Sequence, residues 1–182
     1  MQKLVTGLFL TAALFAAAPT WAQQKRNSPH ETISTVVDGS RIMIVYGRPY
    51  SKDPKTGQIR KIWGGLVPYG EVWRTGADEA TLLITEKPLV FGATTVPAGA
   101  YTLWTVPTAT GASLVINKQI GQWGVDSQYD QKRDLARIPL TLSKTEKTVD
   151  QFLISLAKDA SGGDINMAWE NTQYSIHFTV KK

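Results

Sequence analysis

The sequence predicts an all-β fold: a single antiparallel β-sandwich or jelly-roll-like domain that follows an N-terminal signal peptide. Three observations support this prediction. Apolar residues recur at every second position in many short segments, and patterns with the helical period of 3.6 residues are almost missing. Turns rich in glycine separate these segments. Their number, roughly nine or ten, is typical of an antiparallel sandwich rather than of alternating strands and helices.

Residues 1–22 have the features of a cleavable secretory signal. Lys3 precedes an apolar run from Leu4 to Ala18, and Pro19 ends any helix there. Thr20-Trp21-Ala22 then supplies the small residues that signal peptidase recognises, with cleavage after Ala18 as an alternative. The run is shorter than the roughly 20 residues of a membrane-spanning helix. We therefore expect an exported protein, periplasmic or secreted, with no integral membrane segment after cleavage.

The remainder, about 160 residues, suits one domain with a sizeable core. We expect a flexible lead-in at 23–29 and a single β-sandwich domain at 30–182. The chain has no cysteine, so a hydrophobic core rather than disulfides must stabilise the fold. Its net charge of +5 is too small to indicate nucleic-acid binding.

The predicted strands fall into two kinds. Four runs are apolar on both faces, which indicates central strands or strands whose outer face a loop covers. They are residues 42–46, 81–85, 101–106 and 114–116. Four other segments alternate strictly. They are residues 137–143, 152–156, 165–169 and 174–180. In the first of these, the alternation places Ile138, Leu140 and Leu142 on the inward face.

Two long segments do not have a strand pattern. They are Arg48 to Glu79 and Gly121 to Arg133. Both are rich in glycine and aromatic residues, and predicted strands flank both. Long ordered loops in compact domains are often functional. We therefore look for a functional site in these two segments.

Three blocks in and around the first segment carry a family resemblance. They are Val45–Pro49, Lys61–Gly70 and Val72–Thr81. Further matches are Pro97–Tyr101, Asn117, Gln122–Gly124, Tyr129 and Trp169. With them the chain resembles, over about residues 28–180, a family of secreted bacterial proteins catalogued as domain of unknown function 2911. The resemblance implies an exported β-rich fold and brings no established activity. Asp78 stands where the family usually has asparagine, and Ser51–Gln58 is longer than usual, as if a small hairpin were inserted.

The strongest candidate for ligand binding is the first segment. Aromatic rings can stack on a sugar or an aromatic group, and arginine can bind a carboxylate or phosphate with two parallel hydrogen bonds. The candidate residues are Arg48, Trp63, Tyr69, Trp73 and Arg74, with Trp123 from the second segment as a partner of Trp73 across one cleft. The alternative interpretation is structural, because tryptophans in a loop folded over a sheet often plug the end of a sandwich.

Glu79 and Asp78 are weak catalytic candidates. Glycoside hydrolysis needs two carboxyl groups roughly 5–9.5 Å apart. Neighbouring residues on a strand point to opposite faces, so these two residues alone do not provide such a pair. A second carboxylate would have to come from Glu71, Asp126 or Asp134.

The sequence predicts no metal and no cofactor. Its two histidines, His30 and His177, show no ligand spacing, and no nucleophile motif of the G-x-S-x-G kind is present. Basic residues around the inserted hairpin indicate either a solvated tip or an anion-attracting surface. They are Arg48, Lys52, Lys55, Arg60 and Lys61.

These observations favour a binding module over an enzyme. The leading hypothesis is an envelope protein of unknown activity that binds a small molecule, glycan or envelope protein. A hydrolase using the carboxylates of residues 71–79 is the first alternative, and a purely structural or assembly protein is the second.

Overall fold

The computed structural model describes residues 26, 28–123 and 129–182. In this part of the chain the structure consists of nine antiparallel β-strands and one short 3-10 helix, η2, at Gln131–Arg133. The predicted all-β fold is confirmed. None of the described residues forms a helix that could cross a membrane. The predicted leader, 1–22, and most of the predicted lead-in, 23–29, lie outside the described residues.

In the described part of the chain, seven short strands come first, and two much longer strands follow them. They are β1 His30–Val37, β2 Ser40–Gly47, β3 Thr81–Thr85, β4 Leu89–Phe91, β5 Thr94–Val96, β6 Gly99–Pro107, β7 Ala112–Asn117, β8 Asp134–Lys158 and β9 Gly163–Val180. They form one sheet in the order β1-β2-β3-β6-β7-β8-β9-β4-β5.

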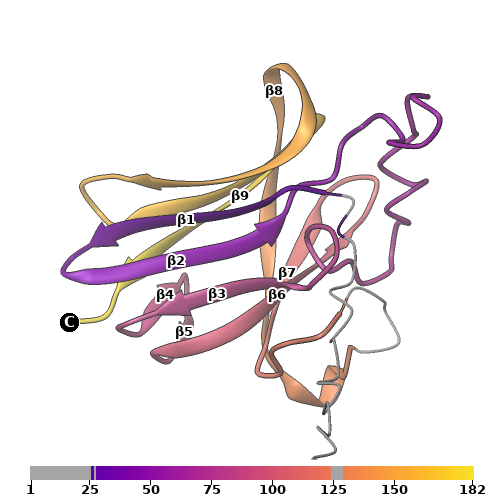
Figure 1. Ribbon diagram of the computed structural model, residues 1–182. Coiled ribbons are helices and arrows are strands. Elements are labelled where there is room, and N and C mark those ends of the chain that lie inside the picture. Colours follow the sequence, from indigo (N-terminus) through magenta and orange to yellow (C-terminus); the bar gives the residue numbers. More distant parts are fainter. Residues whose placement is uncertain (1–25, 27, 124–128) are drawn as a thin grey trace, which may run out of the picture.

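This single sheet folds over into two layers (Figure 1). Strands β1, β2, β3, β6 and β7 form one layer, and the far parts of β8 and β9 with β4 and β5 form the other. One apolar core fills the space between the layers and includes Ile44 and Leu83 from the first and Ile165 and Phe178 from the second. The two layers of the sandwich are therefore parts of a continuous hydrogen-bonded sheet.

The outer face of β6 and β7 is also apolar. Trp104 and Val115 are fully buried there, in a second cluster against Val72 and Tyr129 from the two irregular segments. Their burial explains why β6 and β7 are apolar on both faces, because loops cover the side that would otherwise meet water.

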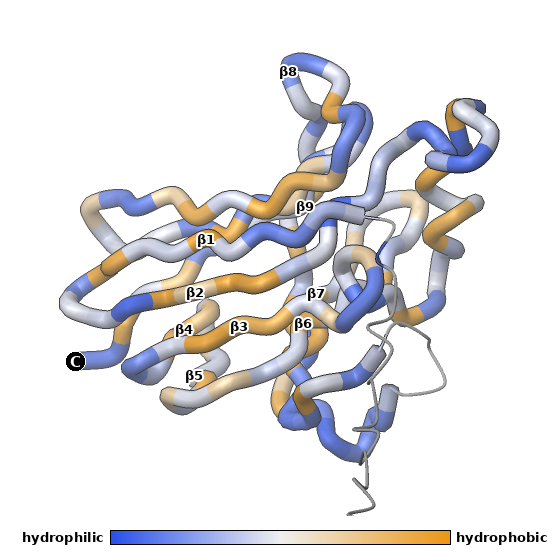
Figure 2. Tube along the Cα trace, in the orientation of Figure 1, coloured by the Kyte–Doolittle hydropathy of each residue, from blue (hydrophilic) through white to orange (hydrophobic). Residues whose placement is uncertain are grey.

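Strands β8 and β9 join segments that the sequence predicted as separate strands. Bulges between Lys144 and Val149, and again between Val149 and Leu153, let β8 turn from one layer into the other. The first bulge projects from the sheet and is mostly hydrophilic (Figure 2).

The prediction that Leu142 faces inward is wrong. This side chain is 41% exposed, whereas Ile138 and Leu140 are buried. The alternation continues past Leu140, but Leu140 is the last residue of β8 that pairs with β7. Beyond it no strand of the first layer continues beside β8, so the same face meets solvent.

The segment from Arg48 to Glu79 lacks regular strands, as predicted, and begins with a small hairpin. We call residues 50–60 the 50–60 hairpin. The backbone N–H of Asp53 donates to Gln58 O over 2.8 Å, and Lys52 forms a bridge with Ile59. Its base is tied to β8, because Ser51 N donates to Asp150 O over 2.6 Å.

Candidate functional site

Aromatic side chains gather where the irregular segment crosses β8 and β9. Trp73 stacks on Trp169, with ring centroids 5.9 Å apart and planes at 23°, and meets Phe152 edge-on at 5.0 Å. Trp63 contacts Trp73 and Tyr174 edge-on at 5.9 and 5.2 Å. Trp169 is fully buried, while Trp63 and Trp73 are partly buried. This packing agrees with the structural interpretation of the two loop tryptophans.

Residues 73–78, the 73–78 loop, are held against the strands by backbone contacts. Trp73 pairs with Thr105 of β6 through two hydrogen bonds, of 2.7 and 2.8 Å. At the other end of the loop, Ala77 N donates to Gly47 O over 3.2 Å. This approach is close because Gly47 has no side chain; a Cβ there would lie 2.2 Å from Ala77 O. The loop is thus fixed at both ends.

Between the 50–60 hairpin and the 73–78 loop lies a cavity of about 330 Å³, which we call the hairpin cavity. Trp73 and Arg74, both predicted site residues, line it together with Tyr50 of the hairpin and Trp169 of β9. Its charged lining residues are Lys55, Arg60, Arg74, Asp53 and Asp78. The volume lies at the lower end of the range typical of small-molecule sites. The cavity therefore joins an aromatic surface to arginine groups.

A histidine lies between the two weak catalytic candidates. His30 Nε2 is 2.7 Å from Glu79 Oε2, and His30 Nδ1 is 4.0 Å from Asp78 Oδ2. Glu79 also forms an ion pair with Arg26. Asp78 lines the hairpin cavity, whereas Glu79 lines a second cavity of about 380 Å³ whose other walls include Val45. The two carboxylates thus serve different cavities, although one imidazole contacts both.

Burial acts to raise the pKa of Glu79, but hydrogen bonds from Arg26 and His30 outweigh it and hold the pKa below its ordinary value of 4.5. A carboxyl group whose pKa is lowered by folding stabilises the fold at pH values above its ordinary pKa. The contribution disappears as the pH falls through the folded-state pKa.

We therefore expect Glu79→Gln to lower the free energy of unfolding by about 1 kcal/mol or less at pH 7, and this difference to shrink as the pH falls below 4.5. Urea denaturation across this pH range measures the effect. Glu146→Gln, in the exposed bulge of β8, should follow the wild-type curve. If the free energy of unfolding of Glu79→Gln ran parallel to that of wild type at every pH, these contacts would contribute nothing to stability.

Three predicted site residues lie away from the hairpin cavity. Arg48 forms an ion pair with Glu31 at 3.1 Å and donates to Phe152 O over 3.1 Å, so it ties β1 to β8. Tyr69 is 45% exposed and packs beside Gly64. Trp63 packs within the aromatic cluster. None of the three lines either cavity.

The two irregular segments do meet, but not as one cleft. Trp123 forms an isolated bridge with Glu79, and Gln122 O accepts a hydrogen bond from Ala80 N over 3.1 Å. Trp123 lines neither of the two cavities. Neither of these two cavities is therefore the cleft that was expected between Trp73 and Trp123. Asp126, suggested as a partner carboxylate, lies outside the described residues.

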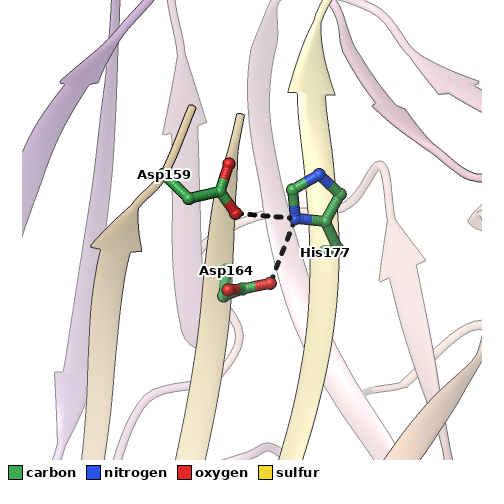
Figure 3. A group of neighbouring side chains, drawn as sticks. All are labelled: Asp159, Asp164 and His177. Carbon is green, nitrogen blue, oxygen red and sulfur yellow. Dashed lines mark hydrogen bonds and ion pairs between the residues drawn. The ribbon is translucent and has the colours of Figure 1, made fainter. Parts of the chain in front are cut away.

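One group of side chains in the described residues has metal-ligand chemistry. At the turn between β8 and β9, His177 Nδ1 is 3.1 Å from Asp164 Oδ1 and 3.5 Å from Asp159 Oδ2 (Figure 3). The other oxygen of Asp159 accepts hydrogen bonds from Ser161 and Gly162, which fixes the turn. All three residues are at least partly exposed. The turn and the hydrogen bond between His177 and Asp164 hold these three side chains together.

Trp169, Arg60 and Tyr50 line the hairpin cavity but were not predicted as site residues. Trp169 was assigned only to a strand, and Arg60 was noted only for the charge of the hairpin. Tyr50 carried no signal, because its place in the cavity wall depends on how the hairpin pairs with β8. The role of His30 was also missed, since Glu79 is 49 residues away from it.

The comparisons with known proteins give one match. A family model described as "Protein of unknown function (DUF2911)" matches residues 28–178. Neither the curated proteins nor the solved structures contain a match to this chain. The matched residues include all nine strands except the end of β9, together with both irregular segments.

Proposed function

The chain belongs to the DUF2911 family of proteins of unknown function, and on that premise we propose that it is a binding protein with its ligand site in the hairpin cavity. One observation carries the proposal. Trp73, stacked on the buried Trp169, lines a cavity of about 330 Å³ that Arg60 and Arg74 also line. Polar groups that converge on a concave site fix the orientation of a ligand, and this cavity has both charged and aromatic side chains in its lining.

The chemistry of the walls supports a small molecule rather than a large partner. An indole ring presents a flat apolar surface to a sugar or aromatic ring, and a guanidinium group forms paired hydrogen bonds with planar acceptors. We also propose that the protein acts outside the cytoplasm, in the periplasm or medium. The composition of residues 1–22 supports this location.

The proposal predicts that variants of the cavity lose binding while they keep the fold. A thermal-shift screen of the purified protein against envelope sugars, muropeptides and nucleotides first finds a ligand. We then expect Arg74→Ala and Tyr50→Ala each to weaken its binding about tenfold or more. The Tyr50 ring is 41% exposed, so its loss should leave the unliganded melting temperature nearly unchanged.

Arg41→Ala provides the matched control. Arg41 is exposed near the start of β2 and lines neither cavity, so this variant should bind like wild type. Wild-type affinity in both cavity variants would place the ligand elsewhere on the protein and refute the proposed site.

A hydrolase is the second candidate, favoured by the contact between His30 Nε2 and Glu79 Oε2 beside the second cavity. A histidine paired with a carboxylate can act as a general acid–base group. Under this proposal Glu79→Gln abolishes turnover but retains ligand affinity. Under the binding proposal the wild-type protein has no turnover, and Glu79→Gln binds the ligand as tightly as wild type.

A further inference from the structure

We propose that the ligand of the hairpin cavity is a single-ring compound of about monosaccharide size that carries a carboxylate or phosphate group. This inference rests on the binding function proposed above and adds the chemistry of the ligand. It depends on two features of the cavity: its charge and its aromatic wall.

The charges that line the cavity favour an anion. Three cationic side chains, Lys55, Arg60 and Arg74, lie there with two acidic ones, Asp53 and Asp78, which leaves an excess of positive charge. Among the described residues, neither Lys55 nor Arg60 forms an ion pair. The guanidinium group of Arg60 donates instead to the backbone oxygen of Tyr50. Both cations can therefore interact with an external anion.

One of the two acidic residues, Asp53, already has hydrogen-bond partners inside the protein. Asp53 Oδ1 accepts hydrogen bonds from the backbone N–H groups of Lys55 and Thr56, over 2.8 and 3.1 Å, and these bonds, together with the nearby charges of Arg60 and Lys55, lower the pKa of Asp53. The carboxylate thus stabilises the turn of the hairpin. Asp78 Oδ2 lies 4.0 Å from His30 Nδ1 and has no hydrogen-bond partner among the described residues. The preference for an anion therefore rests on the two cations of the hairpin, Lys55 and Arg60.

The aromatic wall and the volume limit the rest of the ligand. Trp73 offers a ring surface, and about 330 Å³ is enough for one sugar-sized ring but small for an oligosaccharide. Stacking of the ring on Trp73 and pairing of its acidic group with Arg60 can occur together, because both side chains line the same cavity.

The test compares three ligands that differ in one substituent. Isothermal titration calorimetry of the purified protein with glucuronic acid, glucose 6-phosphate and glucose should show at least one acid binding about tenfold or more tightly than glucose. Because surface ion pairs are screened by salt, this preference should shrink between 20 mM and 500 mM NaCl. Glucose binding as tightly as both acids overturns the inference and leaves the binding function intact. Failure of all three to bind also overturns it, while the wider ligand screen decides the binding function separately.

Variants of the hairpin test whether its cations cause the preference for an acidic ligand. Arg60→Gln and Lys55→Gln should each reduce the ratio of acid to glucose affinity several-fold, and the double variant should bring it close to one. Lys52→Gln is the matched control, since Lys52 is exposed on the same hairpin but does not line the cavity. An unchanged ratio in the double variant, or an equal loss in Lys52→Gln, contradicts recognition of the acidic group at this site.

Discussion

Replacement of Trp169 by alanine is expected to lower the free energy of unfolding by about 3–5 kcal/mol. The Trp169 side chain is fully buried and contacts Trp63, Trp73 and Phe152 at centroid distances of 6.3, 5.9 and 5.7 Å. Alanine would leave a large void, since these rings come from separate segments and cannot all move inward. Urea denaturation monitored by circular dichroism measures the loss.

Two further variants make this expectation specific. Trp169→Phe keeps a ring and should cost clearly less than Trp169→Ala. Leu142→Ala removes an apolar side chain that is 41% exposed, so its effect should stay within about 0.5 kcal/mol. A loss below about 1 kcal/mol for Trp169→Ala would mean that the aromatic cluster is not packed as described.

The second large effect is expected for Gly47→Ala, which should lower the free energy of unfolding by about 2–3 kcal/mol and weaken ligand binding. The added Cβ would lie 2.2 Å from Ala77 O and 2.9 Å from its carbonyl carbon, both backbone atoms. The 73–78 loop must therefore move away from β2. That movement breaks the hydrogen bond from Ala77 N to Gly47 O and shifts Arg74 in the cavity wall.

Gly111→Ala is the matched control. Nothing lies within 4 Å of a Cβ built on Gly111, and its backbone is not left-handed, so this change should be neutral or slightly stabilising. Chemical denaturation and calorimetry on the same samples separate the loss of stability from the loss of binding. Equal stabilities of the two variants would refute the close approach of the loop to β2.

Much of the strand pattern was predictable because alternation along a strand is a local property. Strict alternation was predicted for residues 174–180, and the apolar side chains of this segment, Tyr174, Ile176, Phe178 and Val180, are all buried. The small hairpin after Pro49 was also predicted, because the connection is longer than is usual in the family that the chain resembles. The error at Leu142 has a tertiary cause: alternation tells which face a residue is on, but not where the covering strand ends.

The candidate site was only partly predictable. Trp73 and Arg74 were identified from an irregular segment rich in aromatic residues, and both line the hairpin cavity. Arg48 belongs to the same segment, yet its guanidinium group joins β1 to β8. Composition can show that a loop contains residue types that are able to bind a ligand. It cannot distinguish a side chain in a cavity wall from one that holds two strands together.

The sequence by itself determined the all-β class, the two irregular segments and the residue types from which a binding site can be built. These follow from periodicity and turn chemistry, which act over a few neighbouring residues. Only the tertiary structure decided that the 50–60 hairpin faces the 73–78 loop over Trp169, and that His30 meets Glu79 across 49 residues of chain. The physical reason is that these contacts depend on how one sheet bends over itself at the bulges of β8. No local sequence pattern predicts that bend.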